Sequence, residues 1–128
     1  MTQESPLGLV LWTTDIQALS RFLSVVGGFT VEGQHPGFAV LRADGASIQL
    51  HADETFRGHP WHEALTREGV ARGIGAELRL RVADVEQSYS AALRLGGLAI
   101  EAPCEVEGTR ECQVMGPDGF LVTVWQPL

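Results

Sequence analysis

The fold is decided by a stretch that the chain carries twice, first as Leu7-Gly8-Leu9-Val10-Leu11-Trp12-Thr13-Thr14-Asp15 and again, 69 residues later, as Ala76-Glu77-Leu78-Arg79-Leu80-Arg81-Val82-Ala83-Asp84. Each copy alternates between two faces, as a β-strand does. Each ends in an aspartate that can cap a following helix. A Gly-Gly pair stops both helical segments at the same spacing, as Gly27-Gly28 and Gly96-Gly97. An internal repeat of this kind predicts two equivalent structural modules.

The rest of the first module is predicted from spacing. Apolar residues recur at helical intervals after Asp15, namely Ile16, Leu19, Leu23 and Val26. Three strands are expected after the glycines, at about 30–34, 37–43 and 46–52. Asp44-Gly45 is a tight hairpin turn between the last two. Residues 55–75 are expected to link the modules, with a short helix over Trp61–Arg72 that starts beside Pro60.

The second module repeats the order of the first. Its helix is expected to turn four residues toward the sheet, Val85, Tyr89, Ala92 and Leu95. Strands are expected near 98–104, 109–115 and 120–126. Shifted by 74 positions, the last of these overlays 46–52. We therefore predict an α+β protein with two tandem βαβββ modules in a single domain over residues 1–128, module one at 6–54 and module two at 76–128.

Composition limits the classes of function. The chain has 128 residues, hydrophobic content of 45% and a formal net charge of −7, which argues against non-specific nucleic-acid binding because phosphates are repelled. No apolar run reaches the roughly 20 residues that cross a bilayer. The first six residues, Met1 to Pro6, have no basic segment of the kind that begins a secretory signal. We expect a soluble, cytoplasmic protein.

Two residue pairs, the cysteines and two of the histidines, have side chains that can form a disulfide or bind a metal. Cys104 and Cys112 are centred on Gly108, so they can face each other across a hairpin, but reduced thiols are expected in the cytosol. His59 and His62 are three residues apart, but Pro60 interrupts the pair and no acidic third ligand has the right spacing. Neither pair is expected to be a disulfide or a metal site.

The order of these features resembles the vicinal oxygen chelate superfamily, the group of glyoxalases, bleomycin-resistance proteins and extradiol dioxygenases. The resemblance rests on the duplicated βαβββ unit, the strand-Asp-helix-Gly openings and the Gly116-Pro117-Asp118-Gly119 turn before the last strand. It implies that the sheets curl around a concave cavity with the helices outside. It also implies a homodimer with its ligand sites in the cavities.

Enzymes of that superfamily hold a divalent metal in the cavity. Carried onto this chain, the resemblance puts the ligand positions at Gly8, Gln49, Glu77 and Thr123. Glycine has no ligand atom, threonine is a poor ligand, and only Glu77 carries a charge, whereas zinc and iron sites usually take three protein ligands. The chain is in this respect similar to the bleomycin-resistance branch, whose members bind a drug without changing it. No cofactor is expected.

Strand parity extends this set of positions. If Gly8, Gln49, Glu77 and Thr123 point into the cavity, so do their i±2 neighbours. The parity of Phe38 depends on whether a bulge precedes it, and Trp61 lies where it can close over a ligand. The predicted ligand-binding residues are Trp12, Phe38, Gln49, His51, Trp61, Glu77, Arg79, Thr123 and Trp125. The indoles suit a planar aromatic ligand. The alternative interpretations are core or dimer-interface packing for the tryptophans and a solvated strand face for the charged residues.

The sequence thus favours a small-molecule binding protein that confers resistance to an antibiotic or natural product by sequestration, without a catalytic residue. Two alternatives stay open. One is a lyase, isomerase or dioxygenase with an atypical metal site on Gln49, Glu77 and His51, or a metal-free enzyme that uses Glu77 or His51 as a base. The other is an accessory protein of a biosynthetic pathway.

Overall fold

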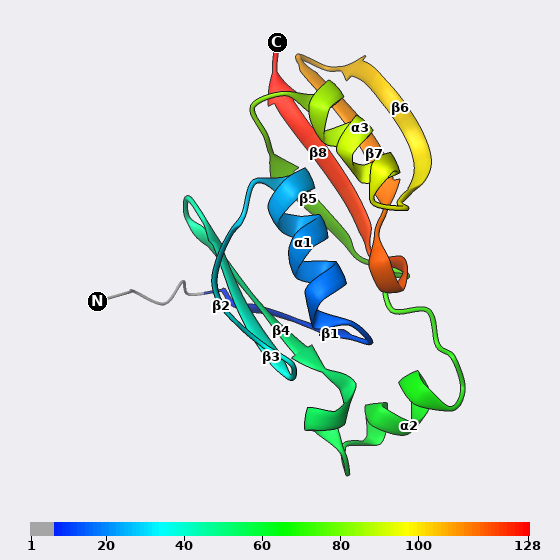
Figure 1. The fold of residues 1–128 in the computed structure, drawn as a ribbon. Coiled ribbons are helices and arrows are strands. Elements are labelled where there is room, and N and C mark those ends of the chain that lie inside the picture. Colours follow the sequence, from blue (N-terminus) through cyan, green and yellow to red (C-terminus); the bar gives the residue numbers. More distant parts are fainter. Residues whose placement is uncertain (1–6) are drawn as a thin grey trace. The chain divides into compact units, whose positions relative to one another are not determined.

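The computed structural model describes residues 7–128 and divides them into two compact units (Figure 1). The first unit comprises the described residues up to 24 together with 29–70, and the second comprises 25–28 and 71–128. The absence of a secretory signal was predicted on residues 1–6, which lie outside the described part. None of the described helices is both long enough and apolar enough to span a membrane.

The first unit contains a four-stranded mixed sheet in the order β1-β4-β3-β2. Its elements are β1 (Leu9–Thr13), α1 (Ile16–Gly27), β2 (Thr30–His35), β3 (Phe38–Ala43), β4 (Ala46–Ala52), the 3-10 helix η1 (Asp53–Phe56) and α2 (Pro60–Thr66). The pair β1–β4 is parallel, and β3 runs antiparallel to both β4 and β2. Helix α2, which the sequence predicts within the linker, clusters with this unit, and so does η1, which the sequence does not predict.

The second unit repeats this topology in the order β5-β8-β7-β6. Its elements are β5 (Glu77–Arg81), α3 (Val85–Arg94), β6 (Leu98–Val106), β7 (Thr109–Met115), the 3-10 turn η2 (Pro117–Gly119) and β8 (Leu121–Pro127). The pair β5–β8 is parallel and the other two pairs are antiparallel. Helix α3 lies against β6, β7 and β8. The predicted α+β class with tandem βαβββ modules is confirmed.

The local signals in the repeat explain the helix boundaries. The Asp15 carboxylate accepts a hydrogen bond from the Ala18 amide at 3.0 Å, and Asp84 accepts one from the Gln87 amide at 3.2 Å. Both bonds satisfy amide groups of the first helical turn. Helix α1 ends at Gly27, and Gly28 has a φ of 77°, a conformation that glycine adopts without steric cost. The predicted caps and stop signal are therefore confirmed.

The buried face of each sheet is aliphatic. In the first unit it includes Leu11, Ala39, Leu41, Ile48 and Leu50. In the second unit it includes Cys112, Val114, Val122 and Val124. These side chains alternate along each strand with the residues of the opposite face, so strand parity fixes which side chains line a candidate site.

Three sequence-based expectations differ from the structure. The alternation of the first strand predicts that Leu7 and Leu9 share the helix-covered face with Leu11, but both are exposed because β1 is an edge strand that begins only at Leu9. Helix α2 ends at Thr66, short of the predicted Arg72, and Gly69 follows with a φ of 66°. The predicted alignment of Cys104 with Cys112 is also wrong. Their hairpin turns about Glu107-Gly108, so Cys104 is paired with Glu111, and Cys112 points to the other face of the sheet.

Candidate functional site

In the first unit, three predicted site residues form a row across the sheet. The backbone register pairs Trp12 of β1 with His51 of β4, and His51 with Phe38 of β3. Residues that are paired across neighbouring strands project to the same face, so the three side chains are neighbours. The His51 and Phe38 rings meet edge to face with centroids 4.9 Å apart. This settles the parity of Phe38, which points to the same face as Trp12.

A ring that the sequence did not single out joins this row. Phe56, the last residue of η1, stacks on Trp12 with a centroid separation of 3.6 Å and an interplanar angle of 16°. Its centroid lies 5.2 Å from that of His51. Strand parity cannot find Phe56, because it lies in the segment after the last strand of the module. Its approach depends on the turn of η1.

The N-terminus of α2 adds the last two rings. His59 caps this helix, since its Nδ1 accepts a hydrogen bond from the Trp61 amide at 3.0 Å. The His59 ring contacts Trp12 edge to face at 5.0 Å and lies 5.8 Å from the Trp61 ring. Trp61 is itself 6.0 Å from Trp12, tilted by 57°. The cap therefore holds Trp61 beside the row.

Together these side chains form an aromatic cluster of six rings, defined as Trp12, Phe38, His51, Phe56, His59 and Trp61. Trp61 is 66% exposed, whereas Trp12 is half-buried. An exposed indole beside a stacked pair offers a flat apolar surface and an N–H donor. The cluster can bind a planar ring by stacking and edge contacts.

The predicted residue Gln49 lies one row away from the cluster, between Val10 and Val40 in the register. It is exposed, and Val10 is 45% exposed. The face that carries the aromatic cluster thus continues as an apolar surface with one amide. Gln49 can supply a hydrogen bond to a ligand that covers this surface.

In the second unit, two predicted residues form one hydrogen-bonded chain. The Thr123 hydroxyl, fully buried, donates to the Glu77 carboxylate and accepts a hydrogen bond from the Gln113 amide at 3.1 Å. Thr123 and Gln113 are paired in the β7–β8 register. Because one hydroxyl both accepts and donates, it links the amide to the carboxylate and fixes the Glu77 side chain.

Arg79 connects this chain to a second carboxylate. Its guanidinium lies 3.6 Å from Glu77 Oε2 and 3.3 Å from Glu111 Oε2. The hydroxyl of Thr109 also donates to Glu111 at 3.0 Å. We call the set of Glu77, Arg79, Glu111, Gln113 and Thr123 the polar face of the second unit.

Trp125 borders the polar face. The Arg81 guanidinium lies 5.5 Å from the centroid of its ring, within the range of a cation–π contact. The two residues are paired across β5 and β8. Trp125 is half-buried, and its ring already contacts a cation within its own unit.

The positions that the resemblance implies as metal ligands do not fit a divalent ion. Gly8 has no side-chain donor, and the Thr123 hydroxyl uses its proton on Glu77. Glu77 is compensated by Arg79. Within residues 7–128, no group of three His, Cys, Asp or Glu side chains is arranged to hold a metal ion. The nitrogen Nδ1 of His59 serves as the cap of α2.

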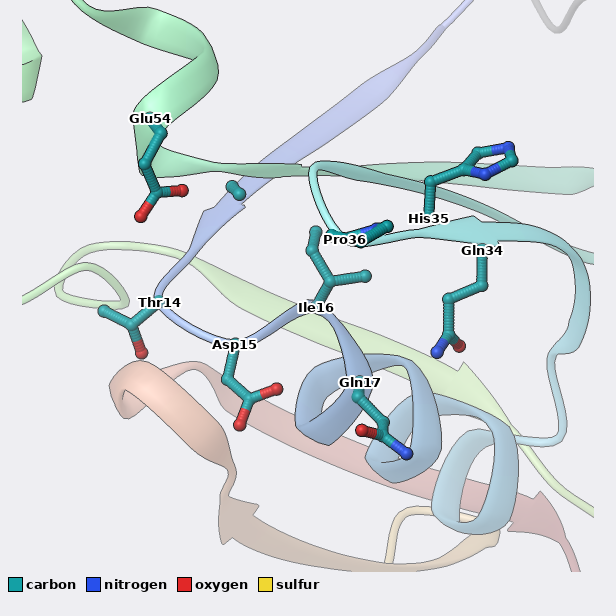
Figure 2. A pocket seen from close by; sticks show the side chains of 9 residues that line it. Thr14, Asp15, Ile16, Gln17, Gln34, His35, Pro36 and Glu54 are labelled. Carbon is teal, nitrogen blue, oxygen red and sulfur yellow. The ribbon is translucent and has the colours of Figure 1, made fainter.

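A surface hollow of about 440 Å³ lies elsewhere in the first unit (Figure 2). Figure 2 shows Ile16 at its centre, with Glu54 and Gln34 on opposite sides. Ala52, which also lines it, follows His51 in β4 and so points to the sheet face opposite the aromatic cluster. None of the predicted site residues lines this hollow.

Neither cysteine is a candidate nucleophile. Burial raises the pKa of the Cys112 thiol to about 11, with nearby carboxylates adding to the effect. A hydrogen bond to the Glu101 carboxylate raises the pKa of Cys104. Both thiols keep their protons at neutral pH, whereas the reactive form of cysteine is the thiolate.

No family model matches the sequence, and no curated protein matches it. Solved structures do match. A glyoxalase/bleomycin resistance protein/dioxygenase family enzyme from Burkholderia phytofirmans PsJN is similar with a TM-score of 0.75, at 23% identity, over 94% of this chain and 97% of that chain. A glyoxalase-related enzyme from Fulvimarina pelagi gives a TM-score of 0.72 at 15% identity, over 98% and 88%.

A glyoxalase/bleomycin resistance protein from Albidiferax ferrireducens T118 matches with a TM-score of 0.69 at 15% identity, over 99% of this chain and 100% of that chain. At these identities the likeness establishes the fold. The chain therefore shares the fold of glyoxalase/bleomycin resistance/dioxygenase proteins. Its function depends on its own side chains.

Proposed function

We propose that the chain is a metal-independent binding protein for a planar aromatic small molecule, within the vicinal oxygen chelate superfamily. The observation that carries the proposal is the aromatic cluster, in which an exposed Trp61 stands beside the stacked pair of Trp12 and Phe56. Exposed aromatic surface of this kind is common at binding sites because a ligand that covers it removes apolar area from water.

More specifically, we propose that the protein confers resistance to an antibiotic or natural product by sequestering it, as members of the bleomycin-resistance branch do. The similar proteins from Burkholderia phytofirmans and Albidiferax ferrireducens carry bleomycin resistance in their names. A sequestering protein binds its ligand without reacting with it. The protonated cysteines and the pairing of Glu77 with Arg79 agree with such a role. A ligand held by several aromatic side chains is expected to bind with micromolar to nanomolar affinity, about −8 to −12 kcal/mol.

The predicted residues of the second unit are proposed as ligand contacts within that unit. Trp125 supplies a further ring, and Gln49, His51, Glu77, Arg79 and Thr123 supply polar contacts. We propose a homodimer with two equivalent cavities in the cytoplasm, where a sequestering protein meets a drug before its target.

Tryptophan fluorescence provides the direct test. Purified protein is titrated with bleomycin, an anthracycline and a quinolone in the presence of a metal chelator. At least one compound is expected to quench the emission saturably, and cells that express the protein are expected to survive that compound better. Absence of both saturable quenching and protection across the panel would contradict sequestration.

A pair of variants at Trp61 separates ring stacking from general effects on the fold. Because Trp61 is mostly exposed, Trp61→Ala leaves stability nearly unchanged. It is expected to weaken the binding of the quenching compound about tenfold, while Trp61→Phe retains most of the affinity. Equal losses in the two variants would exclude Trp61 as a stacking surface.

The similar proteins from Burkholderia and Fulvimarina are named as enzymes, which favours the enzyme alternative. It predicts a stoichiometric metal in the purified protein that the variant Glu77→Ala abolishes. Elemental analysis of the protein and this variant therefore decides between the two functions.

A further inference from the structure

We propose that Arg79 is the resident cation of the polar face, where its guanidinium compensates two carboxylates and keeps divalent metal ions from binding between them. The inference concerns the selectivity of the second unit against metal ions. It holds whether or not the aromatic cluster binds a ligand, and it is tested by a different measurement.

The first step is the arrangement of the residues in rows. On one face of the sheet the register places Arg79, Thr123 and Gln113 side by side across β5, β8 and β7. Glu77 lies in the row before them, and Glu111 lies in the row after them. Arg79 therefore lies between the two carboxylates, and its side chain contacts both of them, at 3.6 Å and 3.3 Å.

The second step is the chemistry of the donors around Arg79. Two carboxylates, a hydroxyl and an amide are oxygen donors of the kind that Mn²⁺, Mg²⁺ and Ca²⁺ prefer. These groups are already linked to one another, since Thr123 donates to Glu77 and accepts from Gln113. Oxygen donors are therefore present in sufficient number. What excludes a divalent ion is the guanidinium of Arg79, because it is permanently charged and repels a second cation placed within a few ångströms of it.

The third step is burial. The Glu111 side chain is 18% exposed and Thr123 is fully buried, whereas the side chains of Arg79 and Glu77 are 49% and 35% exposed. Solvent therefore screens the charge of Glu111 less than that of Glu77. A charge removed from Arg79 leaves the two carboxylates that it contacts without a compensating cation, which favours the uptake of another cation. The geometry thus assigns to one arginine the charge compensation that a metal ion would supply.

The test measures Mn²⁺ binding to the full chain by the loss of the free-ion electron paramagnetic resonance signal. The variant Arg79→Gln is expected to bind one Mn²⁺ per chain at least about tenfold more tightly than the unchanged protein. Arg79→Lys keeps the charge and is expected to behave as the unchanged protein. Thermal unfolding with and without Mn²⁺ provides a second readout, in which only Arg79→Gln gains stability.

The matched control is Arg81→Gln, which removes one positive charge from the same sheet face but leaves Arg79 between the carboxylates. It is expected to gain no Mn²⁺ site. The double variant Glu77→Gln/Arg79→Gln is expected to lose the gained site. If Arg79→Gln gains no site, if Arg81→Gln gains an equal one, or if the double variant keeps it, the inference is overturned. Tight Mn²⁺ binding by the unchanged protein at Glu77 would overturn both this inference and metal-independent binding.

Discussion

The two units share a backbone design and differ in the chemistry of one sheet face. On that face the first unit has two rows, Val10-Gln49-Val40 and Trp12-His51-Phe38. The equivalent rows of the second unit are Arg79-Thr123-Gln113 and Arg81-Trp125-Glu111. Apolar and aromatic side chains thus stand in one unit where charged and polar ones stand in the other.

The opposite face of each sheet behaves differently. Leu50 and Ala39 of the first unit are equivalent to Val124 and Cys112 of the second, and all four side chains are buried. Close packing restricts this face to small or aliphatic side chains. The comparison shows that a duplicated fold preserves what the core requires and leaves the other face available for ligand contacts.

The largest expected effects come from the equivalent core positions. Leu50→Ala is expected to lower the free energy of unfolding by about 3 kcal/mol, and Val124→Ala by about 2 kcal/mol, because each leaves a cavity at a fully buried position. Urea denaturation followed by circular dichroism measures both. A loss under about 1 kcal/mol at either position would show that its core tolerates the cavity.

The buried thiol of Cys112 predicts that the stability of the protein depends on pH, and the equivalent residue of the first unit, an alanine, provides the comparison. The pKa of Cys112 is about 11 in the folded protein and near 9 in the unfolded chain, so between these values only the unfolded state loses the proton. Stability from this group is complete below pH 9 and falls as pH rises to 11, by about 2–3 kcal/mol. Cys112→Ala, which introduces the residue that the first unit has at this position, is expected to flatten the decline.

The measurement for Cys112 is urea denaturation at several alkaline pH values under reducing conditions, with Cys104 replaced by serine in both proteins. The chain has no lysine and a single tyrosine, so few other side chains titrate in this range. Parallel pH profiles with and without Cys112 would contradict the assignment.

The rows that differ most predict a contrast in ligand binding. Trp12→Ala removes the ring that stacks on Phe56 and is expected to weaken the binding of a quenching compound about 20- to 100-fold. Arg81→Ala, at the equivalent position, is expected to change that affinity less than about threefold. Isothermal titration calorimetry measures the affinity of both variants. A larger loss of affinity for Arg81→Ala than for Trp12→Ala would show that the second unit, and not the first, contributes more to ligand binding.

The smallest effects concern the equivalent polar residues Thr123 and Gln49. Thr123→Val leaves Glu77 and Gln113 without their shared hydroxyl and is expected to cost about 1–2 kcal/mol of stability. Gln49→Leu is expected to stay within about 0.5 kcal/mol, because Gln49 is exposed. Thermal unfolding compares the two variants. Equal losses of stability would show that the hydrogen bonds of Thr123 with Gln113 and Glu77 do not stabilise the second unit.

The sequence alone determined the repeat, the class of fold, the helix caps and the parity of the strands. These depend on alternation, on an aspartate before each helix and on glycine at positive φ, which are properties of short segments. Parity also predicted that Trp12 and His51 share one sheet face in the first module, and that Arg79 and Thr123 share one in the second, and the register of the strands agrees.

Only the tertiary structure decided which partner each of these side chains has. Phe56 reaches Trp12 through the turn of η1, and Glu111 reaches Arg79 across an intervening strand. The early end of α2 and the one-residue offset of Cys104 and Cys112 were decided in the same way. Such contacts join residues far apart in the chain through backbone register and side-chain rotamers, and local sequence patterns do not encode either one.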